Sequence, residues 1–262
     1  MRQLILPDTY QGSSAFTLTG DEFHYLTRVL RLKPGDTVPA LDHQGRNVTL
    51  NIESVVSTSC SVRISRKARL EPNDTADATH ISLVQCMPKG QKMDLIVRQA
   101  TETGVREIIP LLSAHTVPVY KGETAKKKHD RWLRIAKQAM QQSGNIHPPA
   151  ISPPQPFKQI DSYWHEYRMR YPGSVGLFFH QNDSTGLGLH SHLQNHDPGD
   201  GVVVCIGPEG GFSSAEVKNL LNIGFHPVYI KTNVFRTETA ALYAVAAIQT
   251  VLLEKNLWSV PE

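Results

Sequence analysis

Two stretches of the chain combine glycine or charged side chains with a preceding apolar strand, a combination suited to ligand binding. Residues 202–206 are continuously apolar and lead into Gly207-Pro-Glu-Gly-Gly211. Ser213 and Glu216 then match a capping box, so a helix is expected to begin there. The glycines therefore lie between the carboxyl end of a buried strand and a helix N-terminus, where α/β proteins usually bind ligands. A tight turn that holds no ligand is the alternative interpretation.

The second stretch, Lys231-Thr-Asn-Val-Phe-Arg-Thr-Glu-Thr-Ala240, follows another expected strand and precedes an alanine-rich apolar helix. Arg236 and Glu238 stand at the entrance of this helix. A guanidinium in that position can stabilise an oxyanion that develops during a reaction. A structural ion pair is the alternative, although a simple connector needs no such concentration of polar groups. We expect this loop and the glycine loop to form one site.

The elements that position these loops alternate between strand and helix from about residue 81 onward. Strands are expected at 81–87, 107–112, 174–179, 201–206 and 227–230, and helices at 93–103, at 125–142 and after Ser213. The strand at 201–206 is apolar throughout, as a parallel strand covered on both faces should be. This half of the chain is therefore predicted to be an α/β domain. The apolar helix after Ala240 is expected to be buried or to form a subunit interface.

The first part of the chain has a different pattern. Residues 16–69 read as short alternating strands separated by turns, with one helix expected over 21–31. We therefore expect a small β-barrel with one helix. The polar stretch 71–77 has no apolar periodicity, so it is the expected boundary between two domains.

Composition and charge restrict the function further. The 262 residues include only three cysteines, Cys60, Cys86 and Cys205, without a CxxC pair, which excludes a disulfide framework. The N-terminal apolar stretch is too short for a signal peptide and no run could span a membrane, so a soluble cytoplasmic protein is expected. Residues 1–140 hold 20 basic and 14 acidic side chains, whereas the remainder holds 7 and 10. This asymmetry favours contact of the N-terminal half with a polyanion.

Other cofactor sites fit the sequence poorly. Gly186-Leu-Gly-Leu-His-Ser191 lacks the third glycine of a dinucleotide fingerprint, and no GxxxxGK motif for a nucleotide phosphate occurs. His190, His192 and His196 are close in sequence, but no neighbouring cysteine and carboxylate set completes a metal site. We expect no metal.

Four short motifs, in order along the chain, resemble those of one known family. They are Arg28-Val-Leu-Arg-Leu-Lys-Pro-Gly-Asp36, Ala100-Thr-Glu-Thr-Gly-Val105, Gly207-Pro-Glu-Gly-Gly211 and Phe235-Arg-Thr-Glu-Thr-Ala240. The chain is thereby similar, over nearly its whole length, to the small-subunit methyltransferase E family of the SPOUT class, which methylates uridine at ring N3 in small-subunit (16S) ribosomal RNA. Where that family commonly has Leu-Gly before the last motif, this chain has Ile230-Lys231. This departure keeps open a second function, that of a non-catalytic RNA-binding ribosome-assembly factor.

The resemblance implies an N-terminal PUA-like β-barrel over residues 1–70 and a SPOUT-type α/β domain with a C-terminal trefoil knot over residues 71–262. It also implies a homodimer, with the terminal helix near the interface, and S-adenosylmethionine as the cofactor. By the positions of the family's knot loops, the cofactor-binding residues are expected to be Phe179, His180, Ile206, Gly207, Pro208, Glu209, Gly210, Gly211, Ile230, Val234, Phe235, Thr237 and Ala240.

Uridine N3 carries a proton and is a poor nucleophile until that proton leaves. We hypothesise that Arg236 stabilises the negative charge that spreads onto the uracil oxygens. Glu238 would orient Arg236 or assist the deprotonation, so these two residues are the predicted catalytic pair. The phosphates of small-subunit ribosomal RNA are expected to be contacted by basic residues of the first half of the chain, namely Arg28, Arg31, Lys89, Lys92, Arg98 and Arg131.

Overall fold

The computed structural model of the chain describes residues 3–7, 9–42, 46–66, 79–116, 122–180, 188–194, 200–230 and 233–254. The chain divides into two compact units, one of Met1–Thr75 with Lys137–His147 and one of Ala76–Ala136 with Pro148–Glu262. The expected boundary between residues 70 and 71 lies outside the described residues. Within the described ranges, no helix has the length and apolar character needed to cross a membrane.

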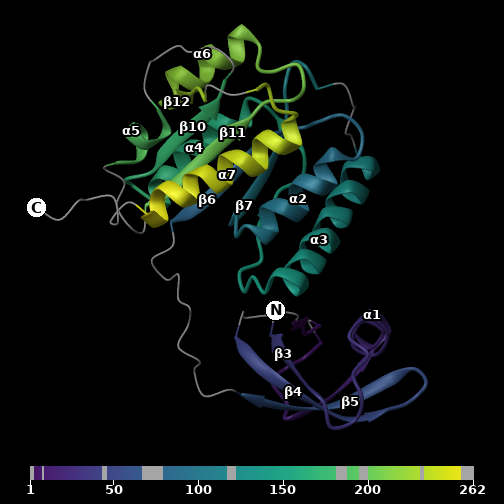
Figure 1. The fold of residues 1–262 in the computed structure, drawn as a ribbon. Coiled ribbons are helices and arrows are strands. Elements are labelled where there is room, and N and C mark those ends of the chain that lie inside the picture. Colours follow the sequence, from purple (N-terminus) through teal and green to yellow (C-terminus); the bar gives the residue numbers. More distant parts are fainter. Residues whose placement is uncertain are drawn as a thin grey trace, which may run out of the picture. The chain divides into compact units, whose positions relative to one another are not determined.

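The first unit contains a curled five-stranded sheet (Figure 1). Its strand order is β1-β3-β4-β5-β2, and the bounds are β1 Leu4–Ile5, β2 Ala15–Thr19, β3 Thr37–Leu41, β4 Asn47–Val55 and β5 Ser59–Arg66. Val48, Leu50 and Ile52 alternate along β4 and are buried, as the sequence predicts. β1 and β2 are the two ends of this order, and no pairing joins them among the residues described. Closure into the predicted barrel is therefore not confirmed.

The helix expected over 21–31 is divided into two kinds of turn. The helix α1 covers Gly20–His24, and the π-helical turn η1 covers Tyr25–Val29, where the Leu30 N–H donates to the carbonyl of Tyr25 at 2.9 Å. Arg31 then adopts a left-handed conformation with φ of 56°, which ends the helix. Phe23 and Leu26 are buried and Leu30 is partly buried against the same core, so the segment keeps an apolar face although its π-helical turn was not predicted.

The second unit is a sheet in which every described strand pair is parallel. The strand order is β12-β10-β11-β6-β7-β8, and β9 also pairs with β7. The bounds are β6 His80–Cys86, β7 Glu107–Leu112, β8 Ala150–Ile151, β9 Gln155–Pro156, β10 Val175–Phe179, β11 Gly201–Ile206 and β12 Phe225–Val228.

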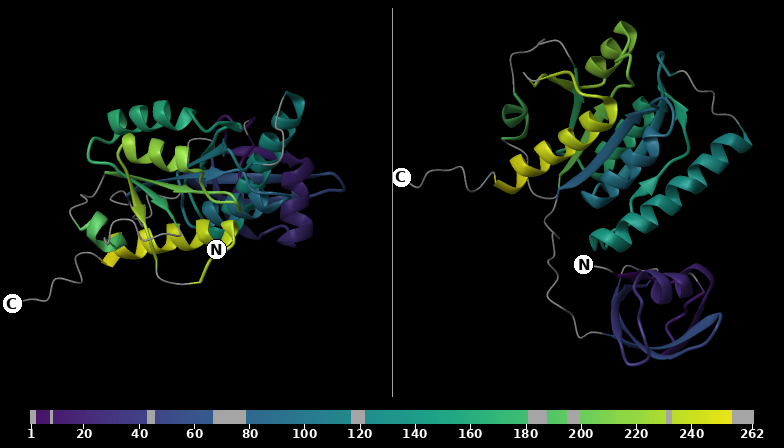
Figure 2. Two further views of the ribbon diagram at one scale, coloured as in Figure 1. Left: turned by 90° about the horizontal axis from the view of Figure 1, so that it is seen from above. Right: turned by 45° about the vertical axis from the view of Figure 1, so that its right-hand side comes forward.

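Helices cover both faces of this sheet (Figure 2). One face packs against α2 (Lys92–Glu102), the first part of α3 (Glu123–Ser143), α5 (Leu189–Leu193) and α7 (Thr237–Glu254), and the other against α4 (Gln159–Arg170) and α6 (Ser214–Asn222). Successive side chains of a strand point to opposite faces, so Val202 and Val204 join the first core and Val203 and Cys205 the second. This explains why β11 is apolar throughout and confirms the predicted α/β class.

Three features of this unit differ from the sequence-based expectations. Residues 148–156, where no strand is expected, contain β8 and β9, which pair with β7. The short pairing fits the prolines there, because proline is tolerated at sheet edges. The helix α4 was not predicted, although Ile160, Trp164 and Tyr167 form its buried stripe. The strand β12 covers Phe225–Val228 rather than 227–230.

Candidate functional site

A cavity of about 570 Å³ opens beside the carboxyl ends of β10 and β11. All thirteen residues predicted to bind the cofactor line it, and so does Arg236; three further lining residues, Phe212, Tyr229 and Asn233, were not predicted. Asn233 belongs to the segment 231–240 that was already singled out, Tyr229 lies in the strand expected just before it, and Phe212 directly follows the glycine loop. Lys231, on which the non-catalytic alternative depended, lies outside the described residues.

The glycine loop favours glycine at position 211 because of its backbone conformation and leaves little room for a side chain at position 210. Gly211 has a φ of 69°, in the left-handed region, and its N–H donates to the carbonyl of Pro208 at 2.9 Å. A Cβ on Gly210 would lie 3.1 Å from the Cβ of His115, which is tighter than ordinary contact. A ring nitrogen of His115 also lies 3.0 Å from the carbonyl oxygen of Gly211. The loop is therefore packed closely against the segment that follows β7.

The predicted capping box is confirmed and does more than begin a helix. The Ser213 hydroxyl accepts a hydrogen bond from the Glu216 N–H, and the Glu216 carboxylate accepts one from the Ser213 N–H at 2.8 Å. The other oxygen of Glu216 accepts a hydrogen bond from the Ala114 N–H at 2.7 Å. One buried carboxylate thus fixes both the end of the glycine loop and the loop after β7.

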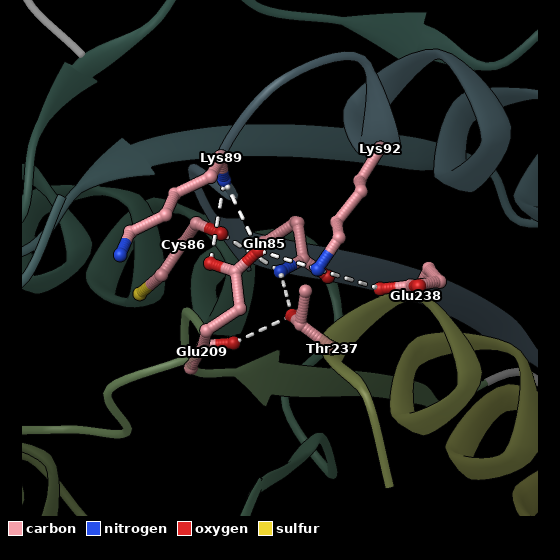
Figure 3. A network of polar contacts seen from close by, with 8 residues as sticks. Gln85, Cys86, Lys89, Lys92, Glu209, Thr237 and Glu238 are labelled. Atoms are coloured by element: carbon pink, nitrogen blue, oxygen red, sulfur yellow. Dashed lines mark hydrogen bonds and ion pairs between the residues drawn. The ribbon is translucent and has the colours of Figure 1, made fainter. Parts of the chain in front are cut away.

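Thr237 connects the glycine loop to the interior of the sheet. Its hydroxyl donates to the carbonyl oxygen of Gly207 at 2.7 Å and accepts from the side-chain amide of Gln85 at 3.0 Å (Figure 3). Gln85 is fully buried in β6 and also donates to the carbonyl of Cys86. The sequence analysis did not single out Gln85, although an amide in a mostly apolar strand was a usable signal, because buried polar groups need partners.

Three charged side chains meet at the rim of the same loops (Figure 3). The Glu209 carboxylate accepts a hydrogen bond from Lys92 Nζ at 2.7 Å and from the Lys89 backbone N–H at 3.2 Å. Lys92 Nζ also lies 3.5 Å from the Glu238 carboxylate. Burial alone would raise the pKa of the Glu209 carboxyl, but the Lys92 ammonium and the backbone donors outweigh it, so that pKa lies below its usual value. The Glu209 carboxylate is therefore ionised and already bonded to two groups of the protein, the Lys92 ammonium and the Lys89 N–H.

The predicted catalytic pair is not brought together. Arg236 is exposed and lines the cavity, and it has no ion-pair partner in the part of the chain that the structure describes. Glu238 is not among the lining residues, and its carboxylate faces Lys92 instead. The predicted orientation of Arg236 by Glu238 is therefore absent from these contacts.

The residues predicted to contact RNA have different surroundings. Arg28 and Arg31 are exposed in the first unit, and Lys89 and Arg98 are exposed in the second. Arg131 is half exposed, but its guanidinium is paired with Asp94 at 2.7 Å. Lys92 is paired with two carboxylates, as described above.

Two protein families match the chain. The RNA methyltransferase domain family matches residues 75–249, and the RNA methyltransferase PUA domain family matches residues 18–65. A Bacillus subtilis protein named ribosomal RNA small subunit methyltransferase E is 29% identical over 93% of this chain and 93% of its own length.

Solved structures agree with these matches. A Legionella pneumophila methyltransferase in complex with S-adenosylmethionine has a TM-score of 0.77 and 27% identity, over 95% of this chain and 96% of that one. A Neisseria gonorrhoeae ribosomal RNA small subunit methyltransferase E bound to S-adenosylmethionine has a TM-score of 0.73 and 25% identity, over 96% and 98%. The matched domain covers most of the chain, so this protein belongs to the RNA methyltransferase domain family and, within it, to the small-subunit methyltransferase E family.

Proposed function

We propose that this protein transfers a methyl group from S-adenosylmethionine to ring N3 of a uridine in small-subunit ribosomal RNA. The observation that carries the proposal is the exposed Arg236 on the wall of a cavity built from the glycine loop and the start of α7. The relatives named above support the cofactor and the RNA substrate.

The cavity suits a ligand of this kind. Its volume of about 570 Å³ lies within the roughly 300–1,000 Å³ of small-molecule sites. The glycine loop gives close access to backbone groups, while Phe179, Ile206 and Phe235 supply apolar surface for a flat ring. When bound, S-adenosylmethionine supplies an electrophilic methyl group on a sulfonium. The thirteen predicted residues that line the cavity are the proposed cofactor contacts.

The chain's own residues would prepare the nucleophile. Uridine N3 must lose its proton before it can form a bond to the methyl carbon, and the charge left behind spreads onto the uracil oxygens. The Arg236 guanidinium can donate hydrogen bonds to one of these oxygens, which lowers the barrier because it stabilises the charge that develops there. We propose that Glu238 contributes only the negative charge of its carboxylate near the site. The proton from N3 is accepted by solvent or by a group of the RNA.

The proposal also includes the knot, the dimer, the closed barrel and the domain boundary that the family implies. The trefoil knot is proposed from the family, and the return of the chain from β12, at one end of the sheet, to α7, which packs on β6 and β11, agrees with it. A homodimer is supported by apolar side chains left exposed on α7, where Leu253 is 72% exposed. We further propose a closed barrel in the PUA-like unit, a domain boundary near residue 70, and a cytoplasmic location, where ribosomal RNA is found.

The test is transfer of labelled methyl from S-adenosylmethionine to unmethylated small ribosomal subunits and, in parallel, to naked RNA. Nucleoside analysis of the product should give 3-methyluridine. Methylation at another atom would refute the assignment to N3. A bound cofactor without transfer to either substrate would mean that the RNA target is wrong.

Salt dependence tests the RNA contacts separately. We propose that Arg28, Arg31, Lys89, Arg98 and Arg131 contact phosphates, and each neutralised phosphate releases counterions. For four or five such contacts, raising salt from 50 to 200 mM should weaken RNA binding by about two to three orders of magnitude. Binding of S-adenosylmethionine, measured by calorimetry, should change little. Equal insensitivity of both affinities would contradict the electrostatic interpretation.

A further inference from the structure

Lys92 lies where three separate segments of the second unit meet. It is the first residue of α2, and its ammonium contacts Glu209 of the glycine loop and Glu238 of the first turn of α7 (Figure 3). The bond to Glu209 joins residues 117 positions apart in the sequence. One side chain therefore connects the start of α2 to both loops that form the cavity.

The charges at this junction depend on one another. The hydrogen bond with Glu209 and the charge of Glu238 raise the pKa of Lys92, so it stays protonated at neutral pH. An oxygen of Glu238 is buried and accepts no hydrogen bond from the described residues, so the Lys92 ammonium 3.5 Å away is its compensating charge. Removing that ammonium would leave two carboxylates near one another with the buried one uncompensated, which is costly.

We propose that Lys92 is a positioning residue for methyl transfer, which holds the glycine loop and the first turn of α7 in place around the cavity, and that it does not contact an RNA phosphate. Arg236 is two residues before Glu238, and the Ala240 N–H bonds to the Arg236 carbonyl at 2.8 Å, so Arg236 moves with this turn. The inference rests on the proposed function, because Arg236 is the group whose position matters.

The neighbouring Lys89 differs from Lys92, because its ammonium takes no part in the described ion pairs of this cluster. Its ammonium points away from Glu209 in Figure 3, and only its backbone N–H takes part in the cluster. Lys92 could reach a phosphate only by giving up its 2.7 Å bond to Glu209. The two lysines are therefore a matched pair that separates positioning from phosphate binding.

The experiment compares Lys92→Met with Lys89→Met in steady-state methylation of small ribosomal subunits. Lys92→Met should lower kcat about 10- to 100-fold, since supporting contacts and small misplacements have effects of this size, and should leave the RNA KM within about twofold. Lys89→Met should instead raise the RNA KM and leave kcat nearly unchanged. Lys92→Arg should recover most of the lost kcat, because a guanidinium can still reach both carboxylates.

A second measurement needs no turnover. Amide hydrogen exchange of residues 209–212 in the free protein should be faster in Lys92→Met than in the wild type, and unchanged in Lys89→Met. Glu209→Gln should give the same faster exchange, and adding it to Lys92→Met should have little further effect.

The proposal is wrong if Lys92→Met raises the RNA KM and leaves kcat and exchange unchanged. Absence of methylation by the wild type would instead count against the proposed function, while the exchange data would still test Lys92. If Lys92→Met does not fold, kcat, the RNA KM and the amide exchange of Lys92→Arg and Glu209→Gln test the proposal in its place.

Discussion

Arg236→Ala should reduce the rate constant of methyl transfer about 100- to 1000-fold, which is the usual result of removing one preorganised donor to a developing oxyanion. Arg236 is exposed on the cavity wall and has no ion-pair partner among the residues described, so the loss reports its role toward substrate rather than a broken structural contact. The measurement is single-turnover methylation with saturating cofactor. Arg236→Lys should give an intermediate rate, because an ammonium keeps the charge but not the planar pair of donors.

The matched control for this prediction is Arg168→Ala. Arg168 is exposed on α4, on the other face of the sheet, where its guanidinium lies over the ring of Trp164. This variant removes the same charge from a residue that is not among those lining the cavity, and it should methylate RNA at nearly the wild-type rate. Full turnover by Arg236→Ala, with unchanged cofactor affinity, would show that Arg236 is not catalytic.

Thr237→Val should lower the free energy of unfolding by about 2–4 kcal/mol, because each buried polar group left without a partner costs about 1–3 kcal/mol. Valine has nearly the shape of threonine but lacks the hydroxyl that serves Gly207 and Gln85. Gln85 is fully buried, so water cannot easily replace the bond to its amide, whereas the carbonyl of Gly207 borders the cavity. Urea unfolding measures the stability change, and calorimetry should show weaker binding of S-adenosylmethionine because the glycine loop is released.

Thr237→Ser provides the comparison for the hydroxyl. It keeps the donor and acceptor and removes only a methyl group, which should cost about 1 kcal/mol. If Thr237→Val is as stable as Thr237→Ser, the hydroxyl does not hold the glycine loop to β6. A stability loss without any change in cofactor affinity would confine its role to folding.

Features with a local cause could be predicted from the sequence. The buried strand β11 follows from a continuous apolar run, and the start of α6 follows from Ser213 and Glu216, whose two reciprocal bonds are both present. The two loops that line the cavity were identified because each follows a strand and combines glycine or charge with a helix start. Where α2 and β7 begin and end was also predicted to within one residue or two.

Features that depend on distant partners could not be predicted. Lys92 was expected to contact phosphate because a sequence shows its charge but not the two carboxylates that neutralise it. Glu238 was expected near Arg236 for the same reason, since both face one helix entrance in the sequence. The π-helical turn at Tyr25–Val29 depends on packing of the first unit, and the helix propensities of single residues do not predict such a turn.

The bond between Gln85 and Thr237, which spans 152 residues, also has a consequence for protein synthesis. At about 5–20 residues per second, Gln85 waits roughly 8–30 s on the ribosome before Thr237 has been made. During that interval, the surface of β6 that α7 later covers has no partner in the growing chain, and apolar strands in this condition are prone to aggregate. The pocket is therefore among the last parts of the enzyme to mature, so slow translation between β6 and α7 should lower the yield of active protein more than it lowers the yield of full-length chains.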